Sequence, residues 1–491
     1  MKYHWIIGGG KTGITLSVYL NSLGIPVFLS EKTYLNKDDK NILNKHNIPF
    51  EEGKNSIDKA IAEAKIVILS PGIPLSHSMV QKFFYKGIEV ISEIECLTRL
   101  HRYLSYISIT GSYGKSTLTQ MLSCLLNAGG VPSIPCGNFG YPLSQALQEK
   151  GKENIFITEL SSYQLETSPT IAPQISVFLN FSENHLERYE TLQAYFLAKW
   201  RLILQTQKIV LIHSHVWKIA RELGCPMPSC HRIMIQPTLE EQQEILISRN
   251  RLFDLKSEYK ELKKIPLPGL PTQESWGFLD IQKDKVTLFS RDADLHEEIS
   301  LKHPKVHLSH NKEHLGIAIG ISRILGLEKK WIETTLPSLE DLELPHRLEL
   351  IEKDPITIIN DSKSTSVEST LVALHSYQDH PSLYLMLGGK KKEGQSFQKI
   401  LIHQNNIQKI ILFGESRHEI YNEIIDLKDK IEVVTSLKEA IPIALQLIPH
   451  GSLLLFSPGC ASYDEFESFE HRGDVFKKMV QSSFPRKNMG G

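Results

Sequence analysis

The sequence has little of what marks a secreted, membrane-bound or nucleic-acid-binding protein. Its six cysteines among 491 residues have neither the paired spacing of a zinc site nor the density of a disulfide scaffold, which fits a reducing compartment. No run approaches the roughly 18 apolar residues of a membrane helix, and the first residues lack the apolar core of a signal peptide. With 55 Lys and Arg against 56 Asp and Glu, the net charge indicates neither a nucleic acid nor an anionic membrane as partner. We therefore expect a cytoplasmic protein.

The chain begins with a pattern that is typical of nucleotide-binding folds. A strand over residues 3–7 is followed by Gly8, Gly10 and Gly13 in GxGxxG spacing and by a helix that ends at Gly24. This is a Rossmann-like βαβ opening, but the glycines alone leave open NAD or FAD binding, another nucleotide-like ligand, or pure packing. Two segments that follow the next strands belong to the same ligand-binding edge: Ser30 to Lys32 and Ser70 to Gly72.

The stretch ISITGSYGKST, residues 107–117, has the layout of a phosphate-binding loop. A β-branched run leads into glycines whose backbone N–H groups can face phosphates, and Lys115 supplies a charge for the outer phosphates. The hydroxyl of Ser116 is suited to Mg²⁺. A strict Walker A motif would have glycine at Ile109, so an ordinary tight turn between a strand and a helix over 116–128 is the alternative. The favoured ligand is ATP or GTP.

Other residues with chemical potential each have an ordinary structural explanation. Glu159 ends a buried strand, where a carboxylate suits Mg²⁺ but equally suits a helix cap or an ion pair. His185 follows the next strand, and a single histidine is more often structural than catalytic. Lys199 lies on a predicted helix, where a solvated lysine is the default, and the run Lys390 to Lys392 by itself is typical of a solvated loop.

Taken together, the motifs resemble the Mur ligases from Ile6 to about Val480. The segments that carry the resemblance are TGSYGKST, GNFG, TELSSYQLE, NFSENHLERY, AKWRLI, HNKEH, LPHRLE, INDSKSTS, LGGKKKEG and SPGCASYDEFESFEHRG. INDSKST and the last segment are similar to the D-glutamate-adding branch, and the DNPR and DYGHHP segments of other branches are absent. The resemblance implies an α/β protein with three domains: a Rossmann-like UDP-substrate domain at 1–97, a central P-loop ATPase-like domain with a parallel sheet at 98–343, and a Rossmann-like amino-acid domain at 344–491.

The implied reaction is ATP-driven amide formation in peptidoglycan precursor synthesis. ATP phosphorylates the carboxylate of UDP-N-acetylmuramoyl-L-alanine (UDP-MurNAc-L-Ala), and the D-glutamate amine attacks the acyl phosphate to give a tetrahedral intermediate. The resemblance also implies two Mg²⁺ sites, a carbamate on Lys199 and a monomer that needs neither nucleic acid nor membrane insertion. Four alternatives remain: an L-alanine-adding Mur ligase, a ligase of the folylpolyglutamate type, an NAD(P)-dependent oxidoreductase, and a non-catalytic nucleotide-binding regulator.

Site residues follow from the resemblance, position by position. The catalytic residues are Lys115, Glu159, His185 and Lys199, and the metal ligands are Ser116, Glu159, His185 and Lys199. ATP contacts are Gly111, Ser112, Gly114, Lys115, Ser116, Thr117, Asn311, His314, Arg347 and Asp361. Contacts to the UDP substrate are Lys11, Thr12, Ser30, Glu31, Lys32, Ser70, Pro71, Gly72, Asn138 and His185. D-Glutamate contacts are Lys363, Thr365, Lys392, Ser462 and Phe469.

The chain departs from the family pattern at a few positions. Tyr113 and His314 stand where asparagines are usual, and Gly459 stands where alanine is usual. The region from about Cys225 to Thr272 matches poorly and is rich in charged residues, so we expect a surface insertion with a helix and a loop.

Overall fold

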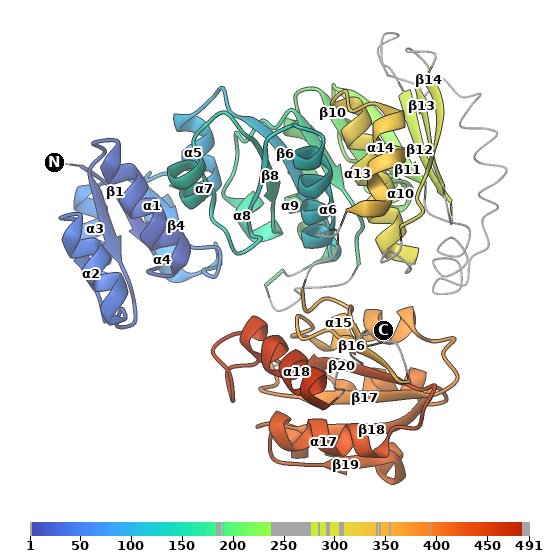
Figure 1. The fold of residues 1–491 in the computed structure, drawn as a ribbon. Coiled ribbons are helices and arrows are strands. Elements are labelled where there is room, and N and C mark those ends of the chain that lie inside the picture. Colours follow the sequence, from blue (N-terminus) through green and yellow to red (C-terminus); the bar gives the residue numbers. More distant parts are fainter. Residues whose placement is uncertain are drawn as a thin grey trace, which may run out of the picture. The chain divides into compact units, whose positions relative to one another are not determined.

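The computed structural model describes residues 2–182, 188–189, 191–236, 276–282, 285–290, 295–303, 309–339, 342, 345–352, 355–392 and 394–483. The chain divides into two compact units, Met1–Leu342 and Glu343–Gly491 (Figure 1). The first unit contains two sheets and the second contains one. All three are mainly parallel and carry helices on their faces, which confirms the predicted α/β fold class.

The first sheet has five parallel strands in the order β3-β2-β1-β4-β5. Its strands are β1 (Tyr3–Ile7), β2 (Val27–Ser30), β3 (Phe50–Glu51), β4 (Ala64–Leu69) and β5 (Val90–Ile91). Its helices are α1 (Lys11–Ser22), α2 (Lys37–Lys45), α3 (Ile57–Glu63), α4 (Ser78–Tyr85) and α5 (Glu93–Leu100). Successive residues of β1 belong to different cores, because Ile6 packs with α1 and Trp5 and Ile7 pack with α4. The sheet is therefore covered on both faces.

The second sheet has nine strands in the order β14-β13-β12-β11-β10-β9-β6-β8-β7, and only β13 and β14 are antiparallel additions. Its strands are β6 (Ser105–Thr110), β7 (Ser133–Gly137), β8 (Ile155–Glu159), β9 (Ile175–Phe178), β10 (Ile209–His213), β11 (His231–Gln236), β12 (Trp276–Gln282), β13 (Lys285–Ser290) and β14 (Leu295–Ser300). Its helices are α6 (Lys115–Ala128), α7 (Leu143–Lys150), α8 (Ser162–Glu166), α9 (Leu192–Gln205), α10 (Ser214–Glu222), α13 (Ser309–Ile324), α14 (Lys329–Thr335) and the short η1 (Leu336–Ser338).

One sequence-based expectation for this sheet is wrong in part. The beginning of the expected surface insertion forms β11, which pairs in parallel with β10 and β12 inside the sheet. Arg232 and Ile235 on this strand are fully buried. The charged composition of the region concealed a short strand, because the three apolar residues Ile233 to Ile235 carry little signal beside their charged and polar neighbours. Residues 237–275, which include the rest of the expected insertion, lie outside the described residues.

Two contacts in the first unit hold the loops that follow the strands. Helix α6 packs along α13 (Figure 1), with Leu118, Leu122 and Leu315 in one buried cluster. Helix α7 packs against α1 and α5, and a second cluster runs from Ile6 in the first sheet to Leu143 in α7. The carboxyl ends of parallel strands meet at one edge of each sheet, so residues after β6, β8 and β9 are neighbours.

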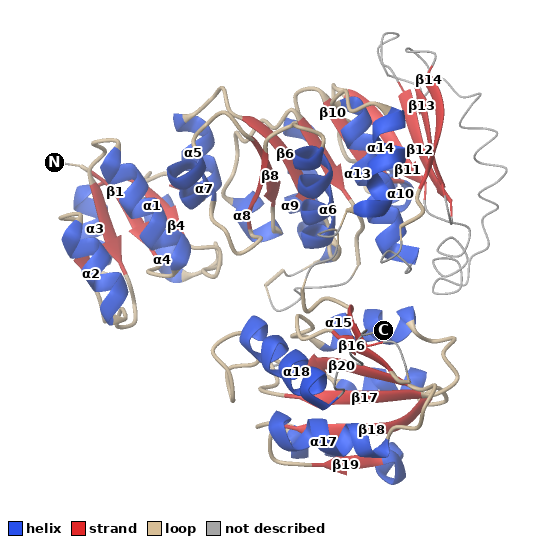
Figure 2. Ribbon diagram, in the orientation of Figure 1, coloured by secondary structure: helices blue, strands red, loops and turns tan. Residues whose placement is uncertain are grey.

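The second unit has a six-stranded sheet in the order β15-β16-β20-β17-β18-β19, in which only β15 is antiparallel. Its strands are β15 (Glu349–Glu352), β16 (Thr357–Asn360), β17 (Leu383–Gly388), β18 (Ile407–Phe413), β19 (Ile431–Val433) and β20 (Leu453–Gly459). Its helices are α15 (Val367–Ser376), η2 (Phe397–His403), α16 (Arg417–Glu423), η3 (Ile425–Lys430), α17 (Leu437–Leu447) and α18 (Phe469–Ser483). Helices α17 and α18 cover one face (Figure 2), where Ile441, Phe456 and Phe476 share a core.

Candidate functional site

The predicted phosphate loop lies between β6 and α6. Gly114 caps the helix with φ +76°, a left-handed conformation that favours glycine. A Cβ at this position would lie 2.3 Å from Nε2 of His314, so the imidazole of α13 covers the loop directly. Ser116 and Thr117 are buried in the first turn of α6, and Asn311 is buried at the beginning of α13. The strand, the turn and the helix N-terminus together form an arrangement that favours anions.

Two lysines meet at one carbonyl of this loop. Nζ of Lys115 and Nζ of Lys199 each donate to the carbonyl oxygen of Gly111, at 2.9 Å in both cases. Lys199 is 2% exposed, and its Nζ lies 5.0 Å from the ring centre of Tyr195. Burial and the neighbouring Lys115 ammonium hold the pKa of Lys199 well below its usual range, although Glu159 acts in the opposite direction. Lys199 on α9 is therefore not the solvated lysine that its sequence context suggests by default.

Glu159 and Asn138 lie together at the same edge of the sheet. The side-chain amide of Asn138 donates to Oε1 of Glu159 at 3.0 Å, and its backbone N–H donates to the Glu159 carbonyl at 2.8 Å. Gly137 makes this approach possible, because a Cβ there would lie 2.5 Å from that carbonyl oxygen. Glu159 is 3% exposed. A buried carboxylate and the Ser116 hydroxyl beside a phosphate loop are donors of the kind that Mg²⁺ takes together with phosphate oxygens.

Two residues near this edge are absent from the sequence-based set. The side-chain amide of Asn180, directly after β9, hydrogen-bonds with the backbone of Ser112 and Tyr113. The guanidinium of Arg188 donates to the carbonyls of Pro71 and Ile73 at 2.8 and 3.3 Å, and so ties the loop after β4 to the second sheet's domain. Both residues stand in the block NFSENHLERY, but no spacing rule distinguishes them within it.

At the first sheet, the carboxylate of Glu31 holds the glycine loop. It accepts from the N–H groups of Gly9 and Thr33, and these bonds lower the pKa of Glu31 although burial, the largest single influence, raises it. Ser30 is fully buried, and its hydroxyl lies 2.7 Å from acceptors on Glu51 and Asn55.

The remaining residues predicted for the UDP substrate lie at two loops. Nζ of Lys11 donates to the carbonyl of Gly140 at 2.8 Å, across to the loop after β7. Thr12 follows it in the first turn of α1, and Lys32 is exposed. Ser70 packs on Gly8, where a Cβ would lie 2.5 Å from its Cβ, and Pro71 and Gly72 form the turn that follows.

In the second unit, Arg347 lies between two residues with left-handed backbones. His346 has φ +62° and Leu348 has φ +49°, which side chains other than glycine rarely adopt. The ring of His346 is fixed by Asn360 at 2.9 Å and lies against Gly473. Strain that is held in this way concentrates at functional positions, which fits the prediction for Arg347.

Asp361 is buried after β16 and is surrounded by hydrogen-bond donors. Its carboxylate accepts from Ser364 and Ser457 at 2.5 and 2.7 Å and from the N–H of Leu348 at 3.3 Å. Burial nevertheless raises the pKa of Asp361 to about 6. The same carboxylate thus helps to fix the backbone next to Arg347.

The residues predicted for D-glutamate form pairs in the second unit. Nζ of Lys392 donates to the hydroxyl of Thr365 at 3.2 Å, and Nζ of Lys363 lies 5.3 Å from the ring centre of Phe469. Ser462 is buried in the loop that follows β20. Gly459 has φ +70°, so the departure from alanine at this position suits its backbone.

The neighbouring basic residues have other partners. Lys390 and Lys391 form ion pairs with Glu415 and Glu419, at 3.4 and 2.7 Å. Arg472 is fully buried and donates to the carbonyls of Ser362 and Cys460, which fixes the two loops that carry the predicted residues.

Some predictions cannot be placed. His185 lies outside the described residues, so its assigned roles toward the substrate and metal stay predictions. Within the described residues, no group of three His, Cys, Asp or Glu side chains could hold a metal ion on its own. In the same part of the chain, no helix combines the length and apolarity that crossing a membrane would require.

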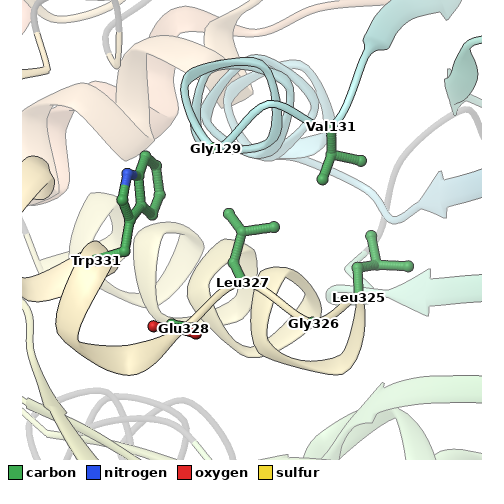
Figure 3. A pocket seen from close by; sticks show the side chains of 7 residues that line it. All are labelled: Gly129, Val131, Leu325, Gly326, Leu327, Glu328 and Trp331. Carbon is green, nitrogen blue, oxygen red and sulfur yellow. The ribbon is translucent and has the colours of Figure 1, made fainter.

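A cavity of about 300 Å³ lies at the other end of α6 (Figure 3). Gly129 and Val131 follow the helix on one side, and Leu325 and Leu327 of the turn between α13 and α14 face them together with Trp331 of α14. The 14 residues of α6 separate it from the phosphate loop by about 20 Å. None of the predicted site residues lines it, so we assign it no part in the candidate site.

Family models match three segments of the chain. Residues 2–92 match the Mur ligase MurD-like N-terminal domain, 109–223 the Mur ligase middle domain, and 346–460 the Mur ligase glutamate ligase domain.

Full-length relatives agree with these matches. The chain is 29% identical to the UDP-N-acetylmuramoylalanine--D-glutamate ligase of Prochlorococcus marinus strain MIT 9515, over 98% of this chain and 95% of that protein. It is 30% identical to the enzyme of the same name from Christiangramia forsetii, over 97% of this chain and 98% of that protein.

Solved structures share the fold at lower identity. The UDP-N-acetylmuramate-alanine ligase MurC of Thermotoga maritima has a TM-score of 0.53 and 14% identity, over 98% of this chain and 100% of that one. The MurF ligase of Thermotoga maritima, in complex with ADP, has a TM-score of 0.54 and 16% identity, over 93% of this chain and 95% of that one. Their similarity supports the three-domain fold.

Proposed function

The chain belongs to the Mur ligase family, and we propose that it adds D-glutamate to UDP-MurNAc-L-Ala at the expense of ATP. The relatives that match it over nearly their full length carry the name of this activity. The product would be a cytoplasmic precursor of peptidoglycan, which links the enzyme to cell-wall biogenesis, cell shape and cell division.

The observation that carries the proposal is the pair of lysines at the Gly111 carbonyl. Lys115 is the cation of a phosphate loop, but a second permanent cation beside it would repel a metal. Lys199 is buried and its pKa is lowered, which favours the neutral amine that reacts with CO₂. The resulting carbamate would be an oxygen donor close to Glu159. A nucleotide-binding oxidoreductase or a passive regulator has no use for this arrangement.

The chain's residues then act by positioning and by neutralising charge. The first turn of α6 and Lys115 bind the outer phosphates of ATP, and Lys11 with the loops after β1, β2 and β4 bind the UDP part of the other substrate. Ser116, Glu159 and the Lys199 carbamate would hold Mg²⁺, which neutralises charge on the transferring phosphoryl group. In the second unit, Lys392, Thr365 and Lys363 bind D-glutamate, while Arg347 and Asp361 serve the nucleotide.

The test is an assay of the full chain with ATP, Mg²⁺ and UDP-MurNAc-L-Ala. We expect phosphate release and a product that is heavier by one glutamate residue with D-glutamate, and neither with L-glutamate. Stimulation by L-alanine with UDP-N-acetylmuramate in place of the alanylated substrate would overturn the proposal in favour of the L-alanine-adding branch.

A further inference from the structure

The phosphate loop lies against a segment to which the proposed reaction assigns no role. This segment is Leu179 to Ser182, which follows β9 at the edge next to β6. A Cβ at Gly111 would lie 3.1 Å from the Cβ of Leu179 and 3.4 Å from Oδ1 of Asn180. The backbone of the loop is therefore as close to this segment as packing allows.

Hydrogen bonds from Asn180 hold one side of the loop. Its Oδ1 accepts from the N–H groups of Ser112 and Tyr113, at 3.0 Å each, and its Nδ2 donates to the Tyr113 carbonyl at 3.2 Å. The N–H of Ser112 also approaches the Asn180 carbonyl at 3.1 Å. A single carboxamide thus bonds both N–H groups and one carbonyl of the two residues that lie between the loop's glycines.

Further contacts fix the same two residues from other directions. The Ser112 hydroxyl accepts from the N–H of Ser182 at 3.0 Å and lies 3.2 Å from its carbonyl. On the opposite side, Nζ of Lys115 donates to the carbonyls of Gly111 and Ser112. The N–H groups of Ser112 and Tyr113 and the Tyr113 carbonyl thus face Asn180, whereas the carbonyls of Gly111 and Ser112 accept from the lysine.

We propose that Asn180 is the positioning residue of the phosphate loop, an inference that rests on the proposed function. Glycines on both sides of Ser112 and Tyr113 give this loop much backbone freedom, which nucleotide binding would have to remove. Asn180 removes it in advance. Because the amides of Ser112 and Tyr113 are bound to Asn180, a phosphate is met by the amides that follow, at the beginning of α6, together with Lys115.

The test compares Asn180→Ala with Asn127→Ala in the full chain. Asn127 is a matched control, because its amide bridges the backbone of Ser133 at the other end of α6, with bonds of 2.8 and 2.9 Å. ADP with Mg²⁺ and UDP-MurNAc-L-Ala are titrated separately by calorimetry, and steady-state kinetics give KM for each substrate. Thermal melts report the stability of both variants.

We expect Asn180→Ala to weaken ADP binding and to raise KM for ATP by about tenfold, with unchanged binding of the UDP substrate. Asn127→Ala should lower the melting temperature and leave ADP affinity unchanged. Equal ADP affinity in Asn180→Ala and wild type, or equal weakening in both variants, would overturn the inference. Absence of ADP binding by the wild type would instead refute the proposed function.

A second measurement covers the case in which Asn180→Ala does not fold. Asn180→Asp retains the oxygen that accepts from Ser112 and Tyr113, so these two amides should stay protected in hydrogen exchange. Its added charge should still weaken ADP binding. Rapid exchange of both amides in this variant and in wild type alike would show that the bonds do not hold the loop.

Discussion

Single side chains in this protein owe their properties to burial rather than to their chemical type. Lys199 and Asp361 are ordinary ionisable residues in the sequence, but both are buried. Burial lowers the pKa of Lys199 and raises that of Asp361, and each shift favours the neutral form. The two residues therefore offer chemistry that an exposed lysine or aspartate lacks. Their pH dependence is the most direct way to detect it.

The first prediction concerns Lys199. Lys199→Ala should lower turnover by about 100-fold or more, because the carbamate proposed to hold Mg²⁺ at the transferring phosphoryl group is lost. Wild-type protein with ¹³C-bicarbonate should give a carbamate NMR signal that the variant lacks. Activity should fall as the pH drops through the lowered pKa of Lys199, because protonation removes the amine that takes up CO₂. Lys208→Ala, a change of an exposed lysine shortly after α9, is the control and should keep full activity and the signal.

The second prediction concerns Asp361, whose pKa of about 6 lies above the ordinary 3.8. Between these values the folded protein binds a proton that the unfolded chain has released, so stability falls as pH rises across this window. Above pH 6 the full cost, on the order of 3 kcal/mol, is present. Asp361→Asn should therefore gain stability relative to wild type as the pH rises from 4 to 7, as measured by calorimetry at both values. If the difference in stability between Asp361→Asn and wild type did not depend on pH, the raised pKa of Asp361 would be contradicted.

The side chains of the candidate site are positioned by the ends of helices and strands. The phosphate loop works as a unit with β6 and α6, since the strand, the left-handed Gly114 and the helix N-terminus fix one another. The same glycine provides the room in which His314 of α13 reaches the loop. Helix α13 thus belongs to the candidate site although it is distant in sequence.

Two glycines that flank α6 allow a matched experiment on its two ends. Gly114 and Gly130 both have φ +76°, but a Cβ at Gly114 meets His314 at 2.3 Å and one at Gly130 meets nothing within 4 Å. Gly130→Ala should cost about 1–2 kcal/mol for its backbone alone and leave ADP binding intact. Gly114→Ala should cost more and abolish ADP binding, as seen in melts and calorimetry. Equal effects of the two changes would show that the contact with His314 is unimportant.

The whole chain consists of two compact units with separate cores, which should be visible in its unfolding. All five tryptophans, including Trp5 and Trp200, precede residue 343 in the sequence. Tryptophan fluorescence therefore reports the first unit alone, whereas circular dichroism reports both. A chain of two cores need not unfold in one cooperative step.

We expect the fluorescence and circular dichroism transitions in urea not to coincide. UDP-MurNAc-L-Ala should move the fluorescence transition to higher urea, because the residues proposed to bind it belong to the first unit. D-Glutamate alone should move to higher urea only the part of the circular dichroism transition that comes from the second unit, which fluorescence does not report. Coincident transitions under all conditions would mean that the two units unfold together.

The fold class and the family could be predicted from the sequence alone, because they depend on local patterns of glycines, apolar strands and motif blocks; the same patterns predicted the strand, glycine turn and helix that β6, Gly114 and α6 form. The sequence could not reveal β11, since six residues among charged neighbours give too weak a periodicity.

The way in which individual residues are used depends on the tertiary fold. That fold turned Lys199 inward to Gly111, tied Glu31 to the glycine loop, and brought Asn180 to Ser112 across 68 positions of sequence. The physical reason is that burial and pairing depend on which strands are neighbours. Strand order is set by the packing of the whole sheet and not by any one segment.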